Sequence, residues 1–402
     1  MMRRAKGLVG VLLTAVVALS SFGSADVSGE DEVDRWNVLV YLQADNNLND
    51  LTQTDLDELM AVGSTDDVNV LVFMDKLDQP AYLYYILQGE MMLLDYEYNG
   101  VEVNTGDPVV FEKFVAYAEE NYPAEHTIIF FWDHGGPTSG VGVDDTTSEG
   151  VSDWLTHHEL IEALQGHRVD VMAMDECSVG QIETIYEYAM HLDTDYVVAS
   201  ESYIGYRGFP YDWILEKLVA RPDMSAYELA VVCVEEFERL FMMTPYKTEI
   251  LTTQSVFVLD EMRNLADKFG ALLDALSKDI GKYRSIIRSA RAGALMPWGA
   301  TSAGRIDLPS FVTGIWAKAP ADSAVKAAAA DFLSAYDKAV PEMGVTKNSD
   351  KYNYKGMGIL FPGSPNYLTI SAAGMFEVYK TFDFPDDGWL QFLELYWGTE
   401  LI

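Results

Sequence analysis

A cysteine and a histidine each follow an apolar, strand-like run of this sequence. The run "IIFFWD" (128–133) leads to His134, and the run "VDVMAMDE" (169–176) leads to Cys177. A thiol within reach of an imidazole forms a nucleophile–base pair, in which the thiolate attacks a carbonyl carbon and the imidazole moves the proton. Taken singly, such a cysteine is more often a buried hydrophobe and such a histidine a loop residue. Their matching positions after successive strand-like runs favour the catalytic interpretation.

The spacing of the two residues predicts that they meet. His134 and Cys177 are 43 residues apart, with one helical pattern at 155–166 between them. A strand–helix–strand crossover takes roughly 30 or more residues and returns the chain, with right-handed sense, to the same edge of the sheet. If the two strands are neighbours, both side chains therefore lie beyond the carboxyl ends of parallel strands, where α/β proteins bind their ligands.

The residues next to His134 and Cys177 suggest how the oxyanion and the thiolate would be stabilised. Gly135 and Gly136 carry no side chain to cover a backbone N–H. We expect the N–H groups of Gly135 and Cys177 to form an oxyanion hole. A helix is expected to open at Cys177, and its first amides would favour a thiolate.

The elements that must position these residues alternate along the first half of the chain. Apolar strands are expected at 36–45, 68–75, 126–133, 169–175 and 195–201, helices at 46–63, 107–122, 155–166 and 179–192, and a hairpin at 81–99. Continuous apolar strands alternating with helices predict an α/β fold whose mostly parallel sheet is covered on both faces.

The second half of the sequence is mainly helical. Helices are expected within 225–242, 260–292 and 322–340, with short strands at 254–260 and 356–362. No linker or repeat separates the halves, so we expect a single catalytic unit over 26–402, with a core at 26–220 and a C-terminal helical extension with late strands at 221–402.

The first 25 residues have the pattern of a signal peptide. A basic start (Arg3, Arg4 and Lys6) precedes the apolar run 8–19, and the small residues Gly23 and Ala25 fit cleavage after Ala25. The run is short for a membrane span, although an uncleaved anchor is the alternative. We therefore expect a secreted protein with no membrane attachment after cleavage.

The net charge limits the classes of binding partner, and the cysteine count limits the possible disulfides. The formal net charge of −36 argues against binding to nucleic acid or anionic membranes and favours solubility, with attraction for cationic substrates. Of the two cysteines, Cys233 lies in an amphipathic helical pattern and is expected to be a buried filler. A Cys177–Cys233 disulfide is the alternative.

Several blocks of the sequence resemble the clostripain family of cysteine peptidases, which belongs to the caspase–haemoglobinase clan. The similar blocks are "WNVLVYLQADNNL", "HTIIFFWDHGG", "GVDDTTSEGVSDWLTHHELIEAL", "VDVMAMDECSVGQIETIYEY" and "DYVVASESYIGYRGFPYDWIL", with "GMGILFP" as a late strand. The resemblance implies a three-layer α/β/α caspase-like sandwich and an endopeptidase acting on peptides or proteins. We expect this endopeptidase to be a monomer.

The resemblance also assigns roles to individual residues. It makes His134 and Cys177 the catalytic dyad, and it implies cleavage after Arg or Lys, with Asp175 in the pocket for that side chain. Side chains two apart on a strand point the same way, so Asp175 can share the cleft with Cys177, unless it instead caps the following helix.

This sequence departs from the family pattern near that pocket. Relatives often carry an acidic "PGDG"-like stretch after the fifth strand, whereas "IGYRGFPYD" here contains Tyr206 and Arg207. Arg207 in the pocket would repel a basic substrate side chain, and Glu201 and Asp212 are possible acidic substitutes. Two alternatives follow, namely a peptidase with non-basic specificity and a non-catalytic binding protein on a peptidase scaffold.

A resident metal is not expected, although calcium dependence is known in the family. The acidic segment 144–149 contains Asp144, Asp145 and Glu149 but lacks the ordered spacing of a Ca²⁺ loop. His157 and His158 are adjacent in a predicted helix and so face different directions, which excludes them as a joint zinc site.

The distribution of basic residues yields a first prediction. No Lys or Arg lies between Phe114 and His167, so self-cleavage after a basic residue is impossible in the segment 135–152. We expect mass spectrometry of the secreted enzyme to show one uninterrupted chain there, beginning at Asp26. A native cut inside 135–152 would contradict this prediction.

Overall fold

The computed structural model describes residues 33–147, 150–243, 252–294, 304–345, 354–371 and 373–401, which fall within one compact unit. The expected signal peptide and Glu149 lie outside the described residues. Within the described ranges, no helix combines the length and apolar character that crossing a membrane requires.

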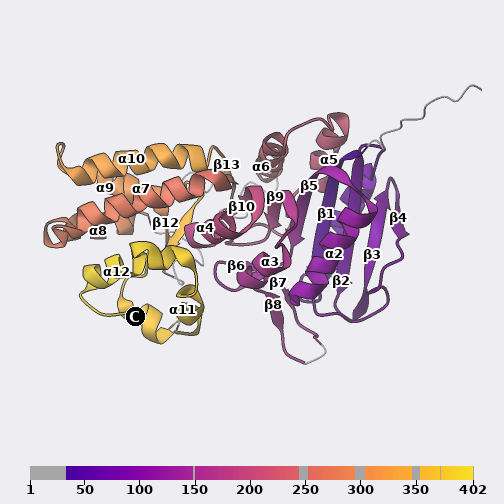
Figure 1. Ribbon diagram of the computed structural model, residues 1–402, viewed down its shortest axis with the longest axis horizontal. Helices are drawn as coiled ribbons and strands as arrows, with labels where there is room; N and C mark the ends of the chain where they lie inside the picture. The colour runs from indigo at the N-terminus through magenta and orange to yellow at the C-terminus, as the bar shows by residue number, and fades with distance from the viewer. Residues whose placement is uncertain are drawn as a thin grey trace, which may run out of the picture. The chain divides into compact units, whose positions relative to one another are not determined.

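A nine-stranded sheet forms the centre of the described structure (Figure 1), in the order β13-β11-β10-β9-β5-β1-β2-β3-β4. Its inner strands run parallel to one another. They are β1 (Asp34–Ala44), β2 (Val68–Lys76), β5 (Ala124–Trp132), β9 (Arg168–Asp175) and β10 (Asp193–Ala199). Antiparallel strands complete both edges, namely the expected hairpin β3 (Gln79–Leu87) and β4 (Glu90–Leu93), and β11 (Thr253–Val258) with β13 (Glu342–Val345).

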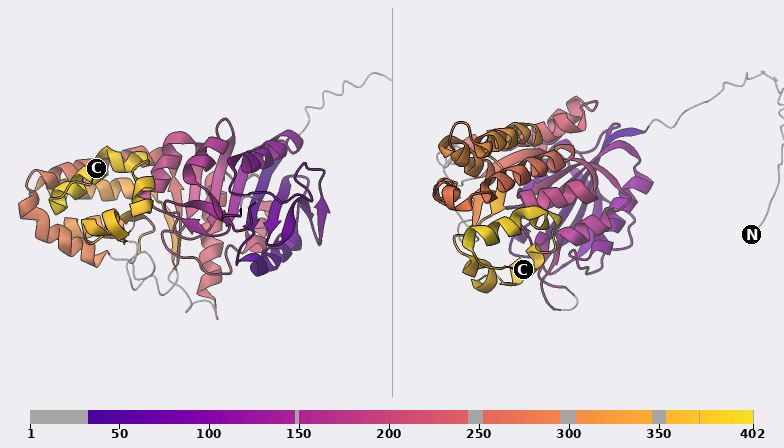
Figure 2. Two further views of the ribbon diagram at one scale, coloured as in Figure 1. Left: turned by 90° about the horizontal axis from the view of Figure 1, so that it is seen from below. Right: turned by 60° about the vertical axis from the view of Figure 1, so that its left-hand side comes forward.

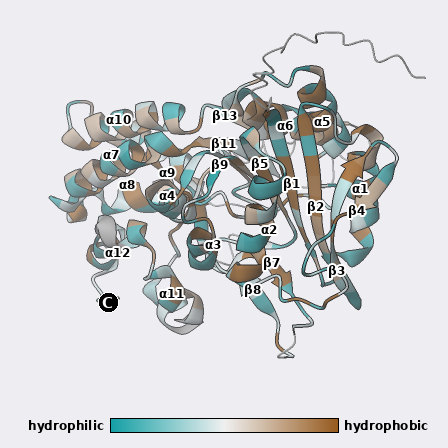
Figure 3. Ribbon diagram, turned by 45° about the vertical axis from the view of Figure 1, so that its right-hand side comes forward, coloured by the Kyte–Doolittle hydropathy of each residue, from teal (hydrophilic) through white to brown (hydrophobic). Residues whose placement is uncertain are grey.

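Helices cover both faces of this sheet, because its inner strands are apolar on both sides (Figure 3). Side chains such as Leu39 and Tyr41 enter one core, whereas Val38 and Val40 on the same strand enter the other. The first core contains α2 (Pro108–Asn121), α3 (His157–Ala163), α4 (Ile182–His191) and α7 (Leu259–Ser277). The second contains α1 (Thr52–Val62, preceded by a 3-10 turn at Asn49–Leu51), α5 (Tyr211–Ala220) and α6 (Ala226–Met242). The α/β prediction is therefore confirmed.

The helical C-terminal half lies beyond the β13 edge of the sheet, coloured orange to yellow in Figures 1 and 2. It contains α8 (Ile280–Gly293), α9 (Leu308–Lys318), α10 (Ala324–Ala339), α11 (Ala373–Tyr379), α12 (Leu390–Trp397) and π-helical turns at Tyr367–Ser371 and Pro385–Trp389. Its apolar side chains belong to the same core as those of α2, α3 and α4.

Two expectations for this half are confirmed, and the structure adds detail to each. The stretch 260–292 forms two helices, α7 and α8, because Asp279 interrupts the first and caps the second through the Lys282 amide. The strand β14 (Gly358–Leu360) exists but pairs with β12 (Arg305–Asp307) in a separate two-stranded sheet. A third small sheet, β6 (Gly135–Gly136), β7 (Gly140–Asp144) and β8 (Asp153–Leu155), follows β5.

A buried carboxylate joins α4 to the C-terminal half. Glu183 accepts hydrogen bonds from the Leu360 amide (2.8 Å) and the Tyr379 hydroxyl (2.9 Å). Its other oxygen lies 3.6 Å from Nη1 of Arg305, which is as deeply buried. Since α4 directly follows the segment that carries Cys177, this cluster ties the C-terminal half to the candidate nucleophile.

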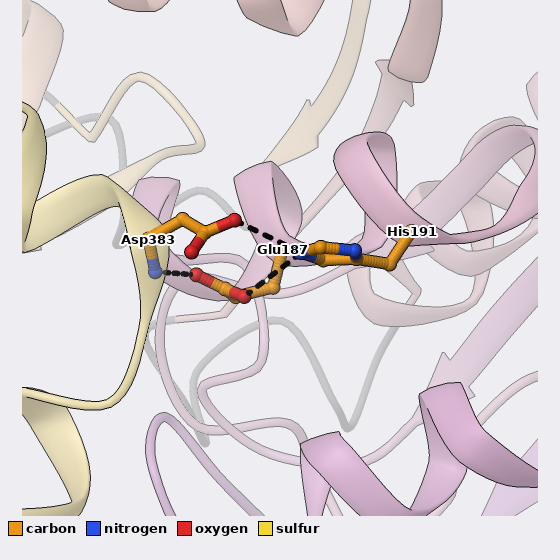
Figure 4. Close-up of side chains that lie close together, drawn as sticks. All are labelled: Glu187, His191 and Asp383. Carbon is orange, nitrogen blue, oxygen red and sulfur yellow. Dashed lines mark hydrogen bonds and ion pairs between the residues drawn. The ribbon is translucent and has the colours of Figure 1, made fainter.

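A second contact between the same parts lies at the surface (Figure 4). His191 at the end of α4 contacts the Asp383 carboxylate at 2.9 Å, and Glu187 accepts a hydrogen bond from the Asp383 amide. Burial raises the pKa of Glu187 to about 7. His191 thus contacts the side chain of Asp383, and Glu187 contacts its backbone, so that α4 is joined to the C-terminal half at this residue.

The Glu183–Arg305 pair yields a stability prediction. Replacing Arg305 by Ala leaves Glu183 buried without its cation, so we expect a loss of about 3–5 kcal/mol in the free energy of unfolding, measured with urea. The control is Arg35→Ala, which removes the partner of Glu125 at an exposed site and should cost about 1 kcal/mol or less. Equal losses of unfolding free energy in the two variants would show that the buried Glu183–Arg305 pair contributes no more to stability than an exposed ion pair.

Candidate active site

The two strands that lead to His134 and Cys177 are parallel neighbours, as the spacing predicts. β5 pairs with β9 up to Trp132, which lies opposite Asp175. The two chains stay in contact beyond the sheet, because a Cβ atom on Gly135 would lie only 2.7 Å from the Cys177 carbonyl oxygen. The backbone after His134 therefore lies directly against the backbone of Cys177.

Cys177 occupies a sharp bend rather than a helix start. The next residue, Ser178, has a positive φ of 63°, and its amide donates to the Ser202 carbonyl at 2.7 Å. The helix α4 begins only at Ile182, so the expectation that helix amides at Cys177 favour a thiolate is wrong. Instead, the Sγ atom accepts a hydrogen bond from the Ile204 amide at 3.4 Å.

The surroundings of the Cys177 thiol oppose its ionisation. Burial, together with the carboxyl groups of Glu176, Asp175 and Asp133, raises the pKa of the thiol to about 11, against the hydrogen bond from Ile204. These surroundings therefore favour the protonated form of the thiol at neutral pH.

His134 is half-buried and is held by an asparagine that the sequence reading did not single out. Its Nε2 atom lies 3.0 Å from Oδ1 of Asn47. Burial lowers the pKa of His134 below its ordinary value, opposed by Asp145. The position of Asn47 in the sequence could have indicated its role, because it lies just after β1, which is parallel to β5 and ends at the same edge of the sheet. The sequence reading treated the run 46–50 only as helix capping.

The turn that carries Asn47 is fixed by its neighbour. The Asn46 side chain donates to Oδ1 of Asp133 at 2.9 Å and to the Val143 carbonyl at 2.8 Å. Asp133 itself accepts a hydrogen bond from the Val143 amide. The segments after β1 and β5 are thus bonded to each other and to β7, which fixes the position of Asn47 beside His134.

Gly135 is required here for steric reasons. A Cβ atom at this position would also lie 2.7 Å from Cβ of Glu176. The Glu176 carboxylate is buried and accepts a hydrogen bond from the Gly142 amide at 3.1 Å. The expected oxyanion groups, the amides of Gly135 and Cys177, thus belong to two segments in direct contact.

Asp175 is buried under the segment that follows β10. Its carboxylate accepts hydrogen bonds from the Phe209 amide (3.2 Å) and the Tyr211 hydroxyl (2.9 Å). Gly208 covers it so closely that a Cβ atom there would lie 2.4 Å from the carboxylate. Burial raises the pKa of Asp175 to about 7, against these hydrogen bonds and the charge of Arg207.

Arg207 lies near Asp175 and forms an ion pair with Glu58 on α1. The other oxygen of Glu58 accepts the Tyr211 amide at 3.1 Å. On the same helix, Asp55 accepts a hydrogen bond from Nε1 of Trp132 at 2.7 Å, and burial together with Asp175 raises its pKa to about 8.

The sequence reading missed Asp55 and Glu58. Their three-residue spacing places both on one side of α1, which packs against α5. Asp212 on α5 lies close enough to Glu58 to raise its pKa. The candidate pocket therefore contains acidic groups from helices α1 and α5 in addition to Asp175 at the end of β9.

Glu201, the other expected pocket residue, faces a different part of the molecule. Its buried carboxylate accepts a hydrogen bond from the Gly356 amide at 2.7 Å and interacts with Asp307. The structure thus brings Asp175 and Arg207 together but directs Glu201 toward the C-terminal half. Cys177 and Cys233 are both free thiols, and Cys233 is buried in the core as expected.

Comparisons with known proteins identify the family of this chain. The family model of the clostripain family matches residues 40–347. Clostripain from Hathewaya histolytica is 27% identical over 233 residues, which cover 48% of this chain and 44% of clostripain, so the match spans less than half of that relative.

Two solved structures share the fold. An inactive zymogen C11 protease from Parabacteroides distasonis has a TM-score of 0.65 at 19% identity, with 88% of this chain and 98% of that chain covered. A secreted C11 cysteine protease from Bacteroides thetaiotaomicron, in complex with an irreversible peptide inhibitor, has a TM-score of 0.63 at 17% identity, with coverages of 87% and 99%. The match of the family model over most of the sequence shows that this chain belongs to the clostripain family of cysteine peptidases.

Proposed function

We propose that this protein is a secreted cysteine endopeptidase that hydrolyses peptide bonds through a dyad of Cys177 and His134. The observation that carries the proposal is the direct contact between the segments after β5 and β9, which brings the thiol, the imidazole and the glycine amides to one edge of the sheet. These are the parts that nucleophilic attack on a peptide carbonyl requires.

His134 acts as a general base rather than as one half of a resting ion pair. The pKa of about 11 for the Cys177 thiol and the lowered pKa of the His134 imidazole favour the neutral form of both groups. Because Nε2 of His134 faces the acceptor Oδ1 of Asn47, that nitrogen carries the proton and Nδ1 is the base. Proton transfer from Cys177 therefore accompanies attack on the substrate.

The remaining steps use the same groups. The thiolate attacks the carbonyl carbon, and the oxyanion is held by the amides of Gly135 and Cys177. His134 then protonates the leaving amine, which yields an acyl-enzyme. It next deprotonates a water molecule, whose attack releases the second product and returns the proton to the thiol.

The dyad is tested by single substitutions. Cys177→Ala and His134→Ala should each lower kcat/KM on peptide substrates by at least about 10⁴-fold, because each removes a reacting group. Cys233→Ala is the matched control, which should retain activity and one alkylation-sensitive thiol. Turnover retained by purified Cys177→Ala would refute the dyad. The absence of turnover in the wild-type chain would favour a non-catalytic binding protein.

We infer that the pocket beside Cys177 accepts Arg or Lys. Asp55, Glu58 and Asp175 all interact electrostatically with Arg207, and Glu58 forms an ion pair with it. A substrate guanidinium or ammonium group would find carboxyl groups within a partly dry site, where charge-assisted hydrogen bonds are strong. The segment from Ile204 to Phe209 covers both Cys177 and Asp175, so it must shift when the side chain enters.

Substrate profiling separates this specificity from its alternative. Wild-type enzyme should cleave fluorogenic peptides with Arg or Lys before the scissile bond in preference to Leu or Glu. Asp175→Asn should lower kcat/KM for the Arg substrate by roughly 10- to 100-fold, because it removes a buried charge partner. Arg207→Gln is the companion variant, expected to improve the basic substrates. Preference of the wild type for a neutral or acidic residue, or improvement of basic substrates by Asp175→Asn, would favour the non-basic alternative.

Secretion rests on the N-terminal sequence and on one relative. Residues 1–25 have the basic, apolar and small-residue regions of a signal peptide. The solved relative from Bacteroides thetaiotaomicron is described as secreted. Both features support an extracellular enzyme.

A further inference from the structure

Three side chains of types that bind metal ions converge where α4 meets the C-terminal half, and the proposed peptide hydrolysis uses none of them (Figure 4). Glu187 and His191 lie one turn apart on α4, and Asp383 belongs to the segment after α11. Each residue offers one ligand atom, and these three atoms all lie within 4.8 Å of one another. The Glu187 side chain is buried, whereas those of His191 and Asp383 are accessible to an ion from solvent.

The spacing of these atoms suits a single small cation. Nε2 of His191 lies 2.9 Å from Oδ2 of Asp383 and 3.8 Å from Oε2 of Glu187. Ligand atoms bound tetrahedrally at about 2.0–2.2 Å from Zn²⁺ lie about 3.3 Å from one another, a value between the two observed distances. The other oxygen of Glu187 accepts the Asp383 amide, which directs Oε2 toward His191. Binding would therefore require only small movements of the two exposed side chains.

The backbone on both sides of Asp383 is held firmly against the neighbouring helices. Phe382 and Phe384 are both buried. The ring of Phe382 packs edge-on against His158 of α3, and that of Phe384 packs edge-on against Tyr186 of α4. Asp383 is thus presented to α4 by packing that does not depend on its own ion pair, and such prior positioning of a ligand favours metal binding.

A second histidine lies beside these three residues. His158 is exposed and is close enough to both His191 and Asp383 for their charges to interact with it. It donates a hydrogen bond to the Thr381 carbonyl, and a metal-ligating histidine is typically oriented by such a bond from the ring nitrogen that does not bind the metal. The adjacent His157 is instead held inside the core by two hydrogen bonds of its own. Histidines from two different helices therefore meet where the adjacent pair does not.

We propose that Glu187, His191 and Asp383 bind one Zn²⁺ ion, with His158 as the fourth ligand. The donor set combines imidazole nitrogen with carboxylate oxygen, which suits Zn²⁺, whereas Ca²⁺ and Mg²⁺ are bound through oxygen. The two carboxylates would balance the charge of the ion. This site is separate from the acidic segment 144–149, which belongs to β7 and the chain that follows it.

The position of the site gives the ion a structural role. It would join α3, α4 and the segment 381–384, which come from distant parts of the sequence. The ion would thereby fasten the C-terminal half to the two helices that flank β9, the strand leading to Cys177. Binding is expected to stabilise the fold whether or not the dyad is catalytic.

Thermal unfolding tests the site without a measurement of activity. The full chain carrying Cys177→Ala is used, because the thiol beside His134 would otherwise offer zinc a second site. It is treated with EDTA, dialysed and titrated with ZnCl₂ at an ionic strength matched with NaCl. Saturating Zn²⁺ should raise Tm by roughly 3–6 °C, because a ligand that binds only the folded state stabilises it. Isothermal titration calorimetry should detect one tight site per chain.

Three substitutions in the same background make the test specific, each compared with its own metal-free Tm. His191→Gln removes the central nitrogen ligand and should abolish both the Tm shift and the calorimetric site. Asp383→Asn keeps the shape of its side chain and should weaken binding by at least about 10-fold. His126→Gln is the matched control, because His126 also contacts an aspartate, Asp170, at 3.1 Å near the start of β5, and it should retain both signals.

The proposal is overturned if Zn²⁺ does not stabilise the Cys177→Ala chain. It is equally overturned if the His191→Gln chain keeps the full shift, or if the His126→Gln control loses the shift to the same extent as His191→Gln.

Discussion

The parallel pairing of β5 with β9 is the constraint on which the rest of this molecule depends. It holds Trp132 opposite Asp175 and brings the chain after each strand to the same edge. Every group of the candidate site is placed relative to that edge. His134 and Gly135 leave one strand, Cys177 leaves the other, and Asn47 follows β1, the next strand along. The crossover through α3 is the element that makes the pairing parallel rather than antiparallel.

The concentration of acidic groups at this edge sets the electrostatic character of the site. Asp175, Glu176 and Asp133 all disfavour a thiolate, and the helix amides that might have offset them begin too far along the chain. Of these three, Asp175 also belongs to the pocket proposed for a basic substrate side chain, where a cation would lower the cost of its negative charge. A neutral thiol in the free enzyme is therefore compatible with the basic specificity proposed for this site.

Much of this arrangement follows from the sequence, because its inner strands are continuous apolar runs and several helices, such as α2, α3 and α6, begin at a capping residue. The neighbouring strands of His134 and Cys177 were predictable from the length of one crossover. The helix start at Cys177 was not, since Ser178 adopts a left-handed conformation that is rare outside glycine. The sequence did not identify Asp55, Glu58 and Asn47 as site residues. Their positions at the site depend on how α1 and the turn after β1 pack against the carboxyl end of the sheet, which no local pattern in the sequence shows. Glu201 was misplaced because its partner, Gly356, lies far along the chain.

The burial of Glu183 has a consequence for how the protein is made. Its cation and one of its hydrogen-bond donors, Arg305 and Tyr379, belong to the last third of the sequence. A nascent chain that has emerged only as far as β10 contains both residues of the proposed dyad but leaves this carboxylate uncompensated within α4. The segment bearing the nucleophile therefore reaches its final packing only after most of the chain has left the ribosome or crossed the membrane. Late completion of the fold would delay proteolytic competence until synthesis or export is nearly finished.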